Sequence, residues 1–114
     1  MKTDGGGSVR GLVRQGDLLL VPVAGLPERA RRLRAGRLVL AEGEATGHAH
    51  VVDDPRASLH GLGWGAESYL SVEGEESVLL VHEEHDPLPV LPGVYEVRRQ
   101  REYVPRQWSR WVSD

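Results

Sequence analysis

Short apolar segments follow one another along this chain, with only glycine- and proline-containing connections between them. Strand-like segments are expected over residues 17–23, 38–41, 45–52, 69–72, 77–81 and 94–104. A parallel α/β arrangement would need a crossover of a dozen or more residues between successive strands, and these connections leave no room for a series of helices. Six or so closely spaced strands therefore favour a small all-β barrel or sandwich.

Two connections carry more specific signals. Pro27 and Gly36 stand where a helix would begin and end, but the arginines of residues 27–34 leave little apolar face. At most one short helical turn is expected there, and an irregular solvated connection is the alternative. Residues 73–76 contain Gly74, so they predict a hairpin turn between the strands at 69–72 and 77–81.

The chain of 114 residues is long enough for one small domain. Residues 1–10 are expected to form a flexible N-terminal arm, because Met1–Ser8 is polar and rich in glycine. Residues 11–114 are then a single β domain. Phenylalanine is absent, so leucine, valine and the three tryptophans are expected to supply most of the core.

Composition also excludes several classes of function. The chain has no cysteine, which excludes disulfides, thiolate nucleophiles and cysteine-ligated metal sites. Its formal net charge of −3 argues against binding nucleic acid through bulk charge. There is neither an apolar run as long as a membrane span nor a signal-peptide core, so a cytoplasmic protein with no membrane partner is expected.

Four of the five histidines fall in two tight clusters. His48 and His50 are two residues apart, so in an extended strand they share one face with Val52. His82 and His85 are three residues apart and would normally face opposite sides, unless a bulge or turn between them brings them together. This geometry permits the two clusters to form one site but does not require it.

Neutral imidazoles on one strand face suit the binding of one divalent metal ion. The expected ligands are His48, His50, His82 and His85, with Glu84 as an alternative to His85. Zn, Fe, Mn, Ni and Cu all accept imidazole and carboxylate ligands, so the ion is not identified. An ion with an open position would support enzymatic chemistry on a small-molecule or ester substrate.

Three further residues are candidates for catalytic roles at such a centre. Glu84 is the expected acid–base group, with Glu44 as a second choice, and either Glu44 or Glu83 could orient an imidazole. Tyr95 and Arg99 are expected to hold an anionic part of the substrate, because both lie on the same face of the last predicted strand.

The first histidine cluster resembles the cupin family of small metal-binding β-barrels. Gly43 precedes His48 by five residues and His50 completes the HxH pair, as in the first cupin motif, while Pro92–Gly93 echoes the second. This resemblance implies metal-assisted oxygenase, isomerase or small-molecule sensing functions. The chain departs from the family because residues 51–55 lack the expected glutamate and the second histidine pair precedes Pro92–Gly93.

Two alternatives from other functional classes remain. A pair of histidines can act as general base and general acid, which predicts a metal-independent ribonuclease or nucleotide hydrolase with arginine and tyrosine contacts to phosphate. A non-catalytic binding module would instead dock through Trp108 and Trp111, although the indoles could equally cap the core. A small β domain with exposed edges is also expected to form a homo-oligomer.

Overall fold

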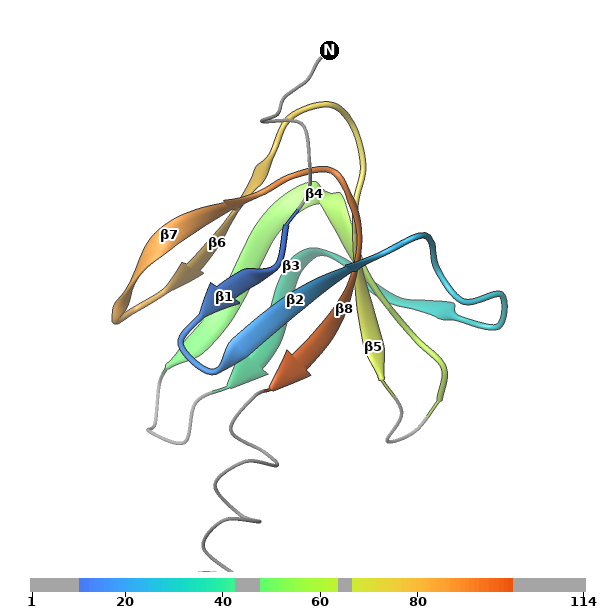
Figure 1. The fold of residues 1–114 in the computed structure, drawn as a ribbon, viewed down its shortest axis with the longest axis horizontal. Coiled ribbons are helices and arrows are strands. Elements are labelled where there is room, and N and C mark those ends of the chain that lie inside the picture. The colour runs from blue at the N-terminus through green and yellow to red at the C-terminus, as the bar shows by residue number, and fades with distance from the viewer. Residues whose placement is uncertain (1–10, 43–47, 64–66, 100–114) are drawn as a thin grey trace, which may run out of the picture.

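The computed structural model describes residues 11–42, 48–63 and 67–99, and every regular element within those ranges is a β-strand (Figure 1). The all-β prediction is confirmed. The strands are β1 (Val13–Gln15), β2 (Leu18–Val23), β3 (Arg31–Glu42), β4 (Ala49–Gly61), β5 (Ser68–Val72), β6 (Val78–His82), β7 (His85–Val90) and β8 (Gly93–Arg99). The sequence pattern did not predict β1 and β7 as separate strands.

The strands form one antiparallel sheet that curls into a nearly closed barrel (Figure 1). Their order is β1-β2-β8-β5-β4-β6-β7, and β3 pairs with β4 outside this path. The two ends of the path meet where the side chain of Gln15, on β1, donates a hydrogen bond of 3.0 Å to the carbonyl oxygen of Asp86 on β7. A side chain, and not strand pairing, therefore bridges the seam between β1 and β7.

The long strand β4 bends in its middle and pairs with two strands in succession. Its C-terminal half pairs with β5 and its N-terminal half with β6, so β5 and β6 do not pair with each other. The prediction of a hairpin at residues 73–76 is wrong for this reason. Arg56 fixes the connection instead: its carbonyl accepts from the N–H of Glu73, and its guanidinium donates to the carbonyls of Glu76 and Ser77.

The predicted helical turn is also absent from its expected place. The N–H of Ala30 donates to the carbonyl of Pro27 in a turn, and β3 begins at Arg31. The stretch has too few apolar residues to bury a helical face, whereas β4 offers it a strand to pair with. The pairing of β3 with β4 shifts register at Gly36, whose φ of 89° suits glycine, opposite the bend of β4.

Leucine and valine fill the barrel, as expected for a chain without phenylalanine. The largest fully buried side chain in the described ranges is that of Tyr95, which is 1% exposed and donates a hydrogen bond of 2.7 Å to the carbonyl of Leu91. All three tryptophans, including Trp108 and Trp111, lie outside the described residues, as do the N-terminal arm at 1–10 and Glu44.

The described part of the chain contains no helix long and apolar enough to cross a membrane.

Neighbouring leucines on β6 provide a test of the barrel interior. Leu80 is fully buried and Leu79 is 56% exposed on the opposite face. We expect Leu80→Ala to lower the free energy of unfolding by about 2–5 kcal/mol because it opens a cavity. Leu79→Ala should change it by less than about 0.5 kcal/mol. Urea unfolding of both variants measures the difference, and equal losses would contradict this assignment of faces.

Candidate histidine centre

The two histidine clusters meet at one end of the barrel. The ring of His82 lies at the centre of the group, with its centroid 4.3 Å from that of His50, 4.7 Å from His85 and 5.7 Å from His48. The rings of His50 and His85 are stacked at 6.2 Å. Residues more than thirty positions apart in the sequence thus form a single cluster of four imidazoles.

The β6–β7 hairpin brings His82 and His85 together. The two residues are register partners on either side of the turn at Glu83 and Glu84, and the pairing of β6 with β7 shifts register between Leu80 and His82. Such an irregularity allows histidines three residues apart to lie on the same side of the hairpin. The hairpin turn therefore positions half of the cluster.

The start of β4 supplies the other half. His50 and Val52 are buried, at 2% and 0% exposed, and they point into the barrel as strand periodicity predicts. Ala49 and Val51 point to the outer face, where they line a groove. His48 immediately precedes the strand and its side chain is 27% exposed.

The turn between β1 and β2 completes the site with two residues that sequence reasoning missed, Gln15 and Asp17. Gln15 and Leu18 are register partners, so Gly16 and Asp17 form a two-residue hairpin loop. Gly16 has a φ of 60°, and a Cβ added to it would lie 2.8 Å from Nε2 of His85. The backbone of this turn thus forms one wall of the cluster.

The side-chain amide of Gln15 determines which nitrogen of His50 carries the proton. The amide NH2 group donates to the carbonyls of Leu80 and Asp86, both at 3.0 Å, so the amide oxygen faces the imidazole. That oxygen lies 2.9 Å from Nδ1 of His50 and must accept from it. In the neutral ring Nδ1 is therefore protonated, and Nε2 carries a free lone pair.

The bare Nε2 of His50 faces a carboxylate. It lies 3.4 Å from Oδ1 of Asp17, whose other oxygen lies 3.4 Å from Nη2 of Arg99. Burial lowers the pKa of His50 below its ordinary value of 6.5, and the neighbouring His82 lowers this pKa further, although Asp17 opposes the shift. His50 is therefore neutral at pH 7, and its contact with Asp17 is not an ion pair.

Two of the other imidazoles, those of His82 and His48, contact the acidic turn. The backbone N–H of Glu84 donates to Nδ1 of His82 at 3.0 Å, which places the proton of neutral His82 on Nε2. The carboxylate of Glu84 lies 3.4 Å from Nδ1 of His48. Glu83 accepts a hydrogen bond of 3.1 Å from the N–H of Ala49, and this bond lowers the pKa of the Glu83 carboxyl.

The three expected catalytic residues have different surroundings. Glu84 is 63% exposed beside His48, and Arg99 contacts Asp17 at the edge of the cluster. The Nε of Arg99 is buried and has no hydrogen-bond partner among the described residues. Tyr95 does not join them, because its ring fills the core and its hydroxyl donates to a backbone carbonyl.

The fifth histidine lies apart, in the C-terminal half of β4. Nε2 of His60 is 2.9 Å from the hydroxyl of Ser58, and burial together with the charge of Arg32 lowers the pKa of His60. It contacts none of the four clustered imidazoles by a ring interaction among the described residues.

Within the described ranges, no three or more histidine, aspartate or glutamate side chains are arranged so that they could hold a metal ion. Metal binding at the cluster would therefore require side-chain rotation. The exposed residues of the β6–β7 turn can rotate most freely, whereas His50 is held by Gln15 and by burial.

Both lowered histidine pKa values make stability depend on pH. In the pH range between the ordinary histidine pKa of 6.5 and the lowered pKa in the folded protein, His50 and His60 are protonated in the unfolded chain but neutral in the folded protein. The free energy of unfolding should therefore be highest above about pH 6.5 and fall on acidification. Urea unfolding in EDTA at about pH 7.5 and about pH 5.5 measures this fall, and His60→Gln should reduce it. Stability that is constant or rises on acidification would contradict it.

Comparison with known proteins places the chain in a family. No curated protein and no solved structure matches it. Residues 14–100 match the family described as "Domain of unknown function (DUF8820)", a range that extends from the residue before Gln15 to the residue after Arg99. The match covers most of the chain and every residue of the histidine centre, and the chain therefore belongs to the DUF8820 family.

Proposed function

We propose that the protein binds a divalent metal ion at the histidine centre and uses it in chemistry on a small or ester-type substrate. The observation that supports this most directly is the bare Nε2 of His50, which faces Oδ1 of Asp17 at 3.4 Å. Two donor atoms held at about 2.1 Å from a tetrahedral ion lie roughly 3.4 Å apart. The two atoms therefore have the separation of neighbouring ligands of one ion.

The hydrogen bonds around this pair have the arrangement that metal ligands commonly show. A ligating imidazole usually donates its second N–H to a fixed acceptor, which Gln15 provides for His50. Glu84 stands in the same position beside Nδ1 of His48, so Nε2 of His48 is the second imidazole donor in this proposal. His85 supplies the fourth ligand by rotation, and His82 would join only by giving up its bond from the N–H of Glu84.

Three nitrogen donors and a carboxylate accept Zn, Fe, Mn, Ni or Cu. A bound ion that accepts a water or a substrate oxygen as a fifth ligand would supply Lewis acidity and lower the pKa of that water. The chain's own residues would orient that chemistry. Glu84 is placed to hold or move a proton beside His48, and Arg99 is placed to neutralise charge beside Asp17.

A specific observation also supports the metal-independent alternative. Nε2 of His50 is bare while Nε2 of neutral His82 carries a proton, and the two ring centroids are 4.3 Å apart. The bare Nε2 of His50 could accept a proton and the imidazolium form of His82 would donate one, which are the two roles that cleavage of RNA through its own 2′-hydroxyl requires. Arg99 would reach a phosphate only by exchanging its contact with Asp17. Tyr95 could not reach one, because it is buried in the core.

The remaining expectations stay predictions from the sequence. They are the similarity to cupins, the cytoplasmic location, the homo-oligomer and the binding module that docks through Trp108 and Trp111.

Elemental analysis of untagged protein after gel filtration tests the metal site. We expect near-stoichiometric binding of at least one of Zn, Mn, Fe, Ni or Cu, either as purified or after addition. His50→Ala should weaken binding by at least about tenfold because it removes the fixed ligand, and Gln15→Ala should weaken it about 10- to 100-fold because it frees the ring.

His60→Ala is the matched control, since it removes a histidine from the same strand but outside the cluster. It should leave metal binding unchanged, and circular dichroism checks that each variant folds. A wild-type protein that binds none of the five ions would contradict the proposal.

RNA cleavage in EDTA distinguishes the two mechanisms. A metal-dependent enzyme should be inactive in EDTA and regain activity when the ion is restored. Cleavage that persists in EDTA and is lost in both His50→Ala and His82→Ala would instead support the acid–base mechanism, because each variant removes one of the two proton-transfer groups.

A further inference from the structure

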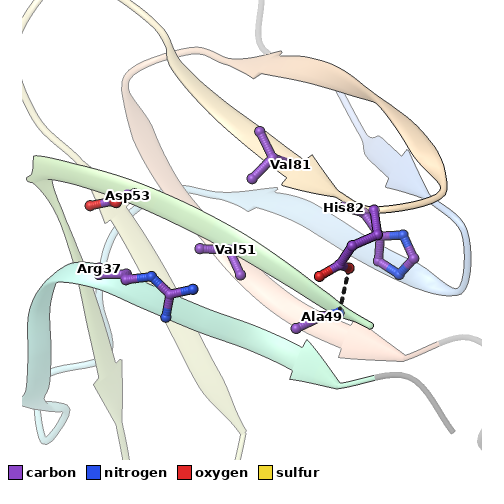
Figure 2. Close-up of a pocket in the computed structure, with 7 residues that line it drawn as sticks. Arg37, Ala49, Val51, Asp53, Val81 and His82 are labelled. Carbon is purple, nitrogen blue, oxygen red and sulfur yellow. Dashed lines mark hydrogen bonds between the residues drawn. The ribbon is translucent and has the colours of Figure 1, made fainter. Parts of the chain in front are cut away.

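The outer face of the barrel carries an open groove beside the histidine centre (Figure 2). Its volume is about 360 Å³, and its lining comes from β3, β4, β6 and the turn that follows β6. The lining residues are Arg37, Ala49, Val51, Asp53, Val81, His82 and Glu83. His82 belongs to both sites, so whatever occupies the groove lies next to the imidazole cluster.

One end of the groove is lined by a cation and an anion, Arg37 and Asp53. Arg37 is exposed, and Figure 2 shows its guanidinium directed along the groove toward Val51 and Ala49. Its register partner on β4 is Asp53, whose carboxylate points away from Val51 in the same view. Among the described residues Arg37 forms no ion pair. Its charge is therefore available to an anionic group in the groove.

The other end is anionic and the floor between the two ends is apolar. Glu83, which follows His82 in the groove lining, accepts the N–H of Ala49 with one carboxylate oxygen, and this bond holds its side chain at that end. Val51 and Val81 form the floor, and Val81 is 37% exposed although it is a large apolar residue. The groove thus presents Arg37 with its neighbour Asp53 at one end, two valines in the middle and Glu83 at the other end.

The geometry points to a small amphoteric ligand, with a carboxylate at one end, an amine at the other and an apolar spacer between them. The carboxylate would pair with Arg37, the amine with Glu83, and the spacer would cover the two valines. From Ala49 to Asp53 the strand rises roughly 13 Å, at about 3.3 Å per residue. Because the side chain of Arg37 extends toward Ala49, the gap between its guanidinium and the Glu83 carboxylate is shorter than this rise. A flexible molecule with a short methylene spacer can cross that gap. This ligand is a substrate only if the proposed function holds, but its binding does not depend on the metal.

Titration of metal-free, ¹⁵N-labelled protein with three probes tests the inference. 6-Aminohexanoate carries both charges, whereas hexanoate and hexylamine each carry one. We expect saturable amide shifts at residues 49–53 and 81–83, with the tightest binding for 6-aminohexanoate. Arg37→Gln should weaken that binding at least about tenfold because it removes a charge-assisted contact.

Arg34→Gln is the matched control, because Arg34 is an exposed arginine of the same strand that does not line the groove. It should bind 6-aminohexanoate like the wild type, and so should His50→Ala. Binding of hexanoate or hexylamine as tight as that of 6-aminohexanoate would overturn the inference, as would the absence of saturable shifts. If the wild-type protein binds no metal but still binds 6-aminohexanoate through Arg37, only the proposed function is contradicted.

Discussion

The side-chain amide of Gln15 is the interaction on which the rest of this structure depends. It is 2% exposed, and both of its N–H donors and its oxygen are used, by Leu80, Asp86 and His50. A buried polar group left without a partner costs about 1–3 kcal/mol, so the three bonds hold one another in place. Because Gln15 belongs to β1 and its partners to β4, β6 and β7, this one side chain joins the strands on both sides of the seam of the barrel.

The same amide links the closure of the barrel to the chemistry of the centre. A reversed amide would place its oxygen against the carbonyl oxygens of Leu80 and Asp86. The amide oxygen and the carbonyl oxygens all accept hydrogen bonds and cannot donate them, so no bond would form. The orientation that closes the barrel is therefore the one that protonates Nδ1 of His50 and exposes its Nε2 lone pair to Asp17. A change at Gln15 would alter the fold and the centre together.

Periodicity predicted the parts of the centre that depend on local geometry. An HxH pair in an extended segment indicated that His50 and Val52 would share a face, and they do. Gln15 and Asp17 could not be found in this way, because β1 has only three residues and Gln15 reaches a partner 65 positions away. The turn at 73–76 shows the same limit. Its glycine indicates a turn, but the flanking strands β5 and β6 each pair with β4 and not with each other, which the local sequence does not reveal.

The centre is rigid on one side and adjustable on the other. His50 is held between Gln15 and the core, whereas His85 and Glu84 are exposed at a two-residue turn. Completing a metal site would therefore immobilise a few turn side chains, at about 0.5–1.5 kcal/mol each, rather than rearrange the barrel. The groove takes His82 and Glu83 from this same turn. The histidine centre and the groove therefore share residues of a single hairpin.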